Sequence, residues 1–138
     1  MSTINIPRLQ RVGAWLVWLV LMAIAFKQLF RGTVGEFSAH GDRLEAQILY
    51  SRFAYFVPFI ISVFAYLLPR IAAALFVFSG AIGYWYLWRV PNSFIVENRH
   101  ELLMAFLPWI GLQACLALMI FGLRRMQKAT NRTLTRDD

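Results

Sequence analysis

Four long apolar stretches constrain the fold of this chain more than any other feature of its sequence. They cover about residues 12–30, 48–68, 71–90 and 102–123. Each is close to the roughly 20 residues that a helix needs to cross about 30 Å of hydrocarbon. The chain is 59% hydrophobic and 15% charged, and a soluble domain of 138 residues could not bury so much apolar surface. We therefore predict an all-α integral membrane protein, a bundle of four transmembrane helices over residues 12–123.

The distribution of Lys and Arg predicts the orientation of this bundle, because cytoplasmic flanks collect basic residues. The side that holds both termini carries eight basic and two acidic residues, a net charge of +6, against six basic and five acidic residues, or +1, on the other side. Residues 1–11 and the basic tail 124–138 are therefore expected to be cytoplasmic (N-in/C-in). The tail is expected to fray and become disordered. The compact size and short connections favour a bacterial inner membrane.

A cleaved signal peptide is the alternative interpretation of the first apolar stretch. Arg8 and Arg11 precede the stretch, and Ala23-Ile24-Ala25 resembles a cleavage site.

Prolines and short connections predict how the helices meet. Only Pro69 and Arg70 separate the second apolar stretch from the third, which predicts a tight antiparallel hairpin between helices 2 and 3. The second helix is expected to begin outside the membrane at Asp42. Pro58 is expected to kink it, and Pro108 interrupts the fourth stretch.

Small and polar residues inside the stretches predict packing within one copy of the chain. Ser79 and Gly83 have the spacing that lets two helices approach closely. Gln113 is expected to face the bundle and to find a hydrogen-bond partner there. The single cysteine, Cys115, is expected to be a small packing residue.

Aromatic residues gather where a membrane surface would lie. Trp and Tyr prefer the headgroup level, so these side chains are expected to form belts at the two ends of the bundle. The outer belt comprises Tyr84, Trp85, Tyr86 and Trp88 with Tyr50, and the inner belt comprises Trp15 and Trp18.

The outer loops hold the residues that are best suited to chemistry. These candidates are His40, Asp42, Glu45, Arg52, Glu97, His100 and Glu101. Imidazole and carboxylate groups suit a metal such as zinc, iron or manganese, and the speculative ligand set is His40, Asp42, Glu97 and His100. The alternative is that these residues are polar because the loops face water.

Arg52 is the second candidate, because a guanidinium inside the membrane boundary needs a partner or a path to water. Glu45, Glu97 and Glu101 are its expected partners. Pairing or snorkelling is one interpretation, and contact with a substrate or lipid headgroup is the other.

No sequence motif indicates a cofactor, and we expect no nucleic acid as partner. The chain lacks a CxxC pair, a P-loop, a nucleophile elbow and an acid within the apolar stretches. The interpretation we favour is a protein that acts by interaction in the bilayer, with a protein partner or as a homo-oligomer. It would serve as an accessory subunit of a membrane complex or as an immunity (protector) protein. The alternatives are an oligomeric transporter or channel, and a metal-dependent or lipid-modifying enzyme.

Overall fold

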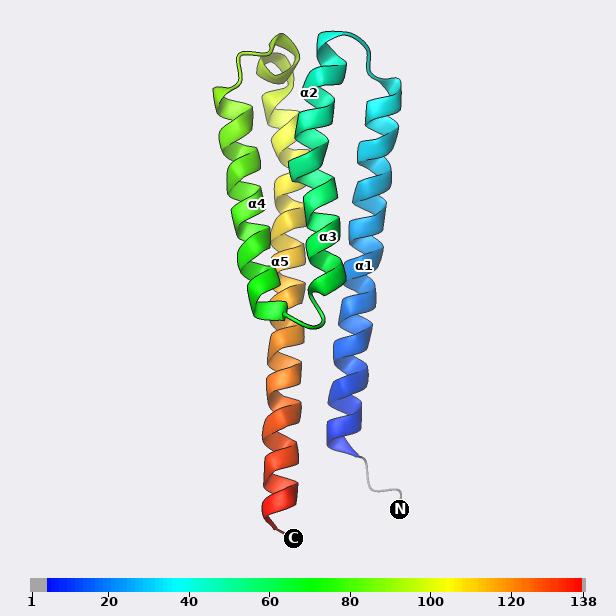
Figure 1. Cartoon of the computed structure of the whole chain (residues 1–138), viewed down its shortest axis with the longest axis vertical. Coiled ribbons are helices and arrows are strands. Elements are labelled where there is room, and N and C mark those ends of the chain that lie inside the picture. The colour runs from blue at the N-terminus through cyan, green and yellow to red at the C-terminus, as the bar shows by residue number, and fades with distance from the viewer. Residues whose placement is uncertain (1–4, 138) are drawn as a thin grey trace.

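The computed structural model describes residues 5–137, apart from the side chain of Asp42, and every regular element in this part of the chain is helical. Four helical stretches are long and apolar enough to cross a membrane, which confirms the predicted number. They stand side by side, and α1 begins and α5 ends at the same end of the bundle, the lower end in Figure 1. The elements are α1 (Ile6–Ser38), α2 (Asp42–Ser51), the π-helix η1 (Arg52–Phe56), α3 (Val57–Phe64), α4 (Pro69–Arg89) and α5 (Ser93–Arg136).

The first and last helices continue well beyond the predicted apolar stretches. α1 begins where the Asn5 side chain accepts a hydrogen bond from the Arg8 amide (3.2 Å), and it runs on to Ser38. α5 begins at an Asn92 cap and ends at Arg136. With 33 and 44 residues, the two helices are about 50 and 66 Å long at 1.5 Å per residue. Both therefore exceed the thickness of a hydrocarbon core.

The second helical stretch consists of α2, η1 and α3, and Pro58 determines its conformation. As predicted, the stretch begins at Asp42, with Gly41 as its N-cap at φ 61°. Proline has no amide hydrogen, and its ring crowds the carbonyl four residues earlier. In η1 the helix widens, and the Val57 amide bonds to the Arg52 carbonyl five residues before it. The effect of Pro58, expected as a kink, is thus a local π turn. Pro108, by contrast, lies inside the continuous helix α5.

Large apolar side chains fill the interior of the bundle. α1 and α4 both pack against α5, and α3 packs against α1 and α4. The interior between the helices is therefore occupied by protein. The largest fully buried apolar side chains include Leu21, Phe76, Leu87, Ile95, Phe106 and Ile120.

Small residues bring α4 close to its neighbours within one copy of the chain, as predicted. A Cβ atom added to Gly83 would lie 3.0 Å from the ring of Phe106 on α5. The Ser79 hydroxyl donates a hydrogen bond to the Phe53 carbonyl of η1 (2.9 Å). Ser79 and Gly83 therefore serve the packing of this bundle.

At the lower end of the four-helix bundle, hydrogen bonds join α1 and α5 to the end of α3 and to the connection between α3 and α4, residues 65–68. The Arg124 guanidinium donates hydrogen bonds to the carbonyls of Tyr66 and Leu67. The Trp18 indole donates one to the Ser62 carbonyl (3.0 Å). The Arg124 bonds give the connection's carbonyl groups a partner, and the Trp18 bond is a second one for a Ser62 carbonyl that already accepts from the Ala65 amide.

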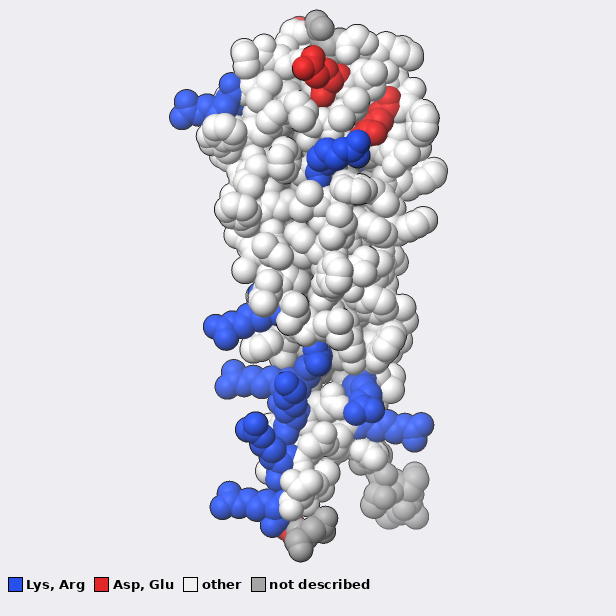
Figure 2. Space-filling view, in the orientation of Figure 1, with Lys and Arg blue, Asp and Glu red and all other residues white. Residues whose placement is uncertain are grey.

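Below this connection α1 and α5 continue as a pair (Figure 1). Lys and Arg gather over this lower part in Figure 2, whereas the larger acidic patches in view lie near the opposite end. α5 is helical through Arg136, where the composition predicted fraying and disorder. The reason for this correction is packing: α1 lies beside the tail, and the Thr130 hydroxyl reaches Gln10 (3.5 Å).

Several side chains face a direction that hydropathy did not indicate. Cys115 is exposed on the outside of the bundle, so the prediction of a packing residue was wrong. Tyr50 and Tyr86 are buried, whereas Tyr84 and Trp85 of the predicted outer belt are exposed. A helix that is apolar on every side carries little periodic signal to mark its inward face.

Replacing Gly83 by valine should destabilise the bundle, because the added atoms would overlap the buried ring of Phe106. Overpacking of this kind costs about 1–3 kcal/mol. Gly111→Val is the matched control, because nothing lies within 4 Å of a Cβ added there. We expect thermal unfolding in detergent, followed by circular dichroism, to shift to lower temperature for Gly83→Val alone. Equal shifts for the two variants would contradict the packing of α4 on α5.

Candidate functional site

The predicted outer-loop residues lie toward the upper end of the bundle in Figure 1, opposite the two termini. The Asp42 side chain lies outside the described part of the structure. The other six predicted site residues are exposed: His40, Glu45, Arg52, Glu97, His100 and Glu101.

The predicted metal ligands do not form a cluster among the described side chains. Glu97 and His100 share one helix, as their spacing requires, and His40 lies in the connection between α1 and α2. No group of three or more His, Cys, Asp or Glu in the described part of the chain could hold a metal ion. The described residues therefore supply no geometry for a metal centre.

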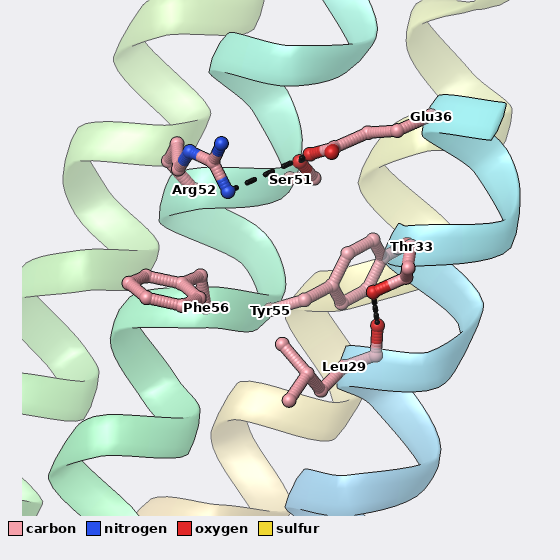
Figure 3. Close-up of a pocket in the computed structure, with 8 residues that line it drawn as sticks. Leu29, Thr33, Glu36, Ser51, Arg52, Tyr55 and Phe56 are labelled. Carbon is pink, nitrogen blue, oxygen red and sulfur yellow. Dashed lines mark hydrogen bonds and ion pairs between the residues drawn. The ribbon is translucent and has the colours of Figure 1, made fainter.

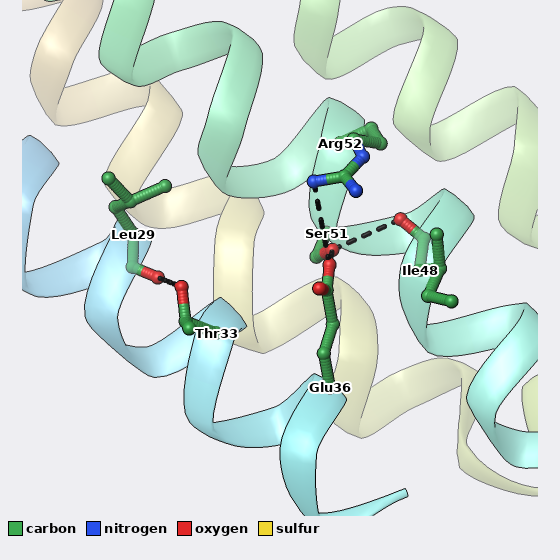
Figure 4. Close-up of polar contacts among 6 residues, drawn as sticks. All are labelled: Leu29, Thr33, Glu36, Ile48, Ser51 and Arg52. Atoms are coloured by element: carbon green, nitrogen blue, oxygen red, sulfur yellow. Dashed lines mark hydrogen bonds and ion pairs between the residues drawn. The ribbon is translucent and has the colours of Figure 1, made fainter. Parts of the chain in front are cut away.

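Arg52 has a different partner from the three that the sequence suggested. Its guanidinium lies 3.7 Å from Oε1 of Glu36, a residue of α1. The Ser51 hydroxyl donates a hydrogen bond to the same oxygen and lies 3.0 Å from the Ile48 carbonyl (Figure 4). Arg52, Ser51 and Glu36 therefore form a polar cluster that joins α1 to the start of η1.

The length of α1 explains why the sequence did not indicate this cluster. The predicted stretch ended at Phe30, which left Glu36 in a loop of undefined position. α1 instead continues to Ser38 and carries Gly32 and Glu36 on one helix face, four residues apart. This four-residue spacing was the only feature of the sequence that could have indicated the pocket beside Glu36.

A pocket of about 230 Å³ lies beneath the polar cluster, between α1 and η1 (Figure 3). We call it the α1–η1 pocket. Its upper wall carries the polar cluster, and its lower wall carries apolar groups, including Leu29 and Phe56. The lining residues are Leu29, Gly32, Thr33, Glu36, Ser51, Arg52, Tyr55 and Phe56.

Tyr55 forms the back of this pocket, and Tyr50 packs against Tyr55 from behind. A Cβ added to Gly32 would lie 2.5 Å from the Tyr55 ring, so this ring packs directly on the backbone of α1. The hydroxyl groups of Tyr55 and Tyr50 are 3.3 Å apart, and the Tyr50 hydroxyl donates to the Leu102 carbonyl of α5 (2.8 Å). The pocket wall is thus connected to three helices.

Two glutamine side chains on α1 and α5 are almost fully buried within the bundle. Gln28 of α1 and Gln113 of α5 are 3% and 1% exposed. Gln113 faces the bundle as predicted, but neither Nε2 has a hydrogen-bond partner among the described residues. The prediction of a partner for Gln113 was therefore wrong for its Nε2 within the described chain. An unpaired buried amide is costly.

A lysine faces outward between α1 and α5 at a similar level. Lys27 is exposed, and its ammonium lies 5.0 Å from the centre of the Trp109 ring. The described side chains offer it no carboxylate, since their only ion pair joins Arg52 and Glu36. The face of an indole attracts a cation but does not neutralise its charge.

Replacing Tyr50 by phenylalanine should weaken the wall of the α1–η1 pocket, because it removes the hydrogen bond to the Leu102 carbonyl from a buried position. A lost hydrogen bond of this kind costs about 1 kcal/mol. We expect a lower free energy of unfolding in detergent for Tyr50→Phe. The exposed Tyr84→Phe should remain unchanged, and loss of stability in this control alone would contradict the assignment.

Comparisons with models of protein families, with curated proteins and with solved structures find no match to this chain. The role of each site residue therefore rests on its own contacts, burial and charge.

Proposed function

We propose that this chain is a multi-pass protein of a bacterial inner membrane with both termini in the cytoplasm. Four apolar helices support insertion, and the basic lower end of the molecule supports the orientation. The tight antiparallel hairpin of the second and third membrane-spanning helices belongs to this proposal. It is supported by the short connection, residues 65–68, between α3 and α4.

Within the membrane, we propose that the protein acts by binding another membrane protein, as an accessory subunit or as a protector protein. The observation that carries this proposal is the outward-facing Lys27 on an apolar helix. An ionisable residue that faces lipid is costly and usually marks a functional contact.

The depth of Lys27 makes this argument stronger. Glu36 and Arg52 lie at the outer end of the bundle, and Lys27 is nine residues before Glu36 along α1. Nine residues correspond to about 13 Å along the helix axis. The ammonium lies over the Trp109 ring of α5. The Lys27 backbone would therefore lie below the level of Glu36 and Arg52, on the side of α1 that faces the bilayer.

The chemistry of Lys27 defines the partner. It would be a transmembrane helix that carries a carboxylate at the same depth, where a desolvated pair is favoured over two separate charges. A second copy of this chain has no acid in its apolar stretches to supply that carboxylate. α1 is also the least enclosed of the four stretches, with 22% of its apolar window buried against 33–44% for the others. We therefore propose a different chain that docks on the face around Lys27.

The alternative of a transporter or channel receives less support. Phe76, Phe106 and Leu21 are fully buried and occupy the centre of the bundle, so a pathway through one copy would have to displace them. The alternative of a metal-dependent enzyme lacks a ligand cluster among the described residues.

The proposed orientation predicts opposite labelling of the two ends. In a Cys115→Ala background, His40→Cys should react with a membrane-impermeant maleimide added to intact cells. Ala129→Cys should react only after the inner membrane is permeabilised. Both positions are exposed, so access to the reagent decides the result. The reverse pattern would contradict the orientation.

The proposed docking face predicts that Lys27→Met loses its partner while Lys27→Arg retains it. A photo-crosslinker at the exposed Phe30 should capture one defined membrane protein in native membranes. We expect capture to fall at least about tenfold in Lys27→Met, a change of about 1.4 kcal/mol. A charge exchange should restore it, with Lys27→Glu here and lysine in place of the partner's acid.

Two controls make this experiment specific. Lys128→Met removes a basic residue from the lower extension of α5 and should leave capture unchanged. A crosslinker at the exposed Val77 on α4 should not capture the same protein. Capture that does not depend on Lys27, or crosslinks to lipid alone, would overturn the proposed docking face.

A further inference from the structure

The α1–η1 pocket combines the two kinds of surface that a lipid presents. Its polar cluster lies toward the outer end of the bundle, and Leu29, Tyr55 and Phe56 lie on the side toward the middle (Figure 3). With the outer end at the membrane surface, the polar groups would be at headgroup level and the apolar groups at the level of the first acyl carbons. The pocket therefore suits an amphiphile that enters from the bilayer.

The Arg52 guanidinium and the Glu36 carboxylate of the polar cluster can both still bind a ligand. Arg52 is half exposed, and its 3.7 Å contact with Glu36 is longer than a close ion-pair hydrogen bond. Both contacts of Glu36 fall on Oε1, so Oε2 can accept further bonds. A guanidinium has five donors and binds phosphate well, whereas a carboxylate binds an ammonium group.

The surrounding packing holds these two groups in place. The Ser51 hydroxyl fixes the Glu36 carboxylate, and the Phe56 ring lies 5.4 Å from the Arg52 guanidinium. Behind them, Tyr55 is buried against Gly32 of α1. Because π turns frequently occur at functional sites, the position of Arg52 at the start of η1 is consistent with a binding role.

We propose that the α1–η1 pocket binds the headgroup of a zwitterionic phospholipid with a primary amine, of the phosphatidylethanolamine class. Arg52 binds the phosphate, and Glu36 accepts hydrogen bonds from the ammonium group. The acyl chains extend from the pocket into the bilayer past Leu29 and Phe56. This inference rests on the proposed insertion in the membrane but is independent of the proposed protein partner, which would dock elsewhere on α1.

The net charge of the cluster distinguishes this ligand from other lipids. Arg52 and Glu36 together are neutral, which matches a zwitterion, and the carboxylate repels the headgroup of an anionic lipid such as phosphatidylglycerol. A choline headgroup has no N–H to donate to Glu36 and is usually recognised by a cage of aromatic rings. The described lining of the pocket has only two aromatic residues, Tyr55 and Phe56.

Native mass spectrometry of the purified full-length protein tests this proposal. The protein is mixed with equal amounts of phosphatidylethanolamine and phosphatidylglycerol that have the same acyl chains. We expect the wild type to retain phosphatidylethanolamine about tenfold better. Glu36→Gln should reverse this preference, because the pocket becomes net positive, and Arg52→Gln should lose both lipids.

Matched controls separate the pocket from general surface charge. Arg43→Gln and Glu45→Gln change exposed residues of α2 that do not line the pocket, and the wild-type preference should persist in both. It should also persist in Lys27→Met, which separates this proposal from the proposed protein partner. Soluble glycerophosphoethanolamine at equal concentration should not compete, because it has no acyl chains. Competition by this compound would overturn the assignment to a lipid.

A measurement on the unaltered protein guards against variants that fail to fold. A photoreactive phosphatidylethanolamine with its reactive group near the headgroup should label peptides from residues 29–36 and 51–56. Labelling confined to α4 or α5 would overturn the proposal. An equal or greater wild-type affinity for phosphatidylglycerol, or an unchanged preference in folded Glu36→Gln, would also overturn it.

Discussion

The missing amide hydrogen of Pro58 determines how the second helical stretch meets α1. A proline within a helix removes one donor and crowds the carbonyl four residues earlier. The chain accommodates both effects in the π turn of η1, where the Val57 amide bonds to the Arg52 carbonyl. One extra residue in a helical turn rotates the segment before the turn by about 100° relative to the segment after it. The turn thus sets the direction in which Ser51 and Arg52 point, and the two residues meet Glu36. The α1–η1 pocket depends on this local adjustment.

Both ends of the bundle satisfy polar groups, but they do so differently. At the lower end, the Arg124 guanidinium donates to carbonyls of the connection after α3, and the Trp18 indole donates to the Ser62 carbonyl within α3. These contacts join helices and leave the basic groups around them on the surface (Figure 2). At the upper end, the polar cluster keeps a guanidinium and a carboxylate partly exposed over a pocket. The upper cluster thus presents charges of both signs, whereas the pocket beside Arg124 at the lower end is lined by basic side chains alone among its charged residues.

Hydropathy predicted the number and approximate position of the apolar helices, because helix length and the thickness of a membrane set the same scale. It also indicated the close packing at Ser79 and Gly83, since small residues have few other uses within such helices. It did not indicate where α1 ends, because hydropathy marks the end of the apolar stretch at Phe30 and not the end of the helix at Ser38. Glu36 was therefore placed in a loop, and Arg52 was assigned three other possible partners.

The inward faces of the helices were also difficult to predict. Cys115 and Gln113 are two residues apart on α5, about 200° around the helix, so the burial of Gln113 leaves Cys115 on the opposite, exposed face. In a lipid environment the outside of a bundle is as apolar as its inside, so amphipathic periodicity fades. Only the strongly polar Gln113 had a predictable direction. Tyr50 was placed in an aromatic belt because tyrosines favour interfaces, but its hydroxyl finds an acceptor within the bundle instead.

The geometry of α1 would allow one helix to carry both proposed sites without interference. Lys27 and Glu36 are nine residues apart, which is about two and a half helical turns, so they point to opposite sides of the helix. Lys27 faces the α5 side, where it meets Trp109, and Glu36 faces the η1 side, where it meets Arg52. A partner helix seated over Lys27 would therefore leave the α1–η1 pocket open to the bilayer. Because α1 is continuous between the two positions, it can hold a protein contact and a lipid contact at fixed relative depths.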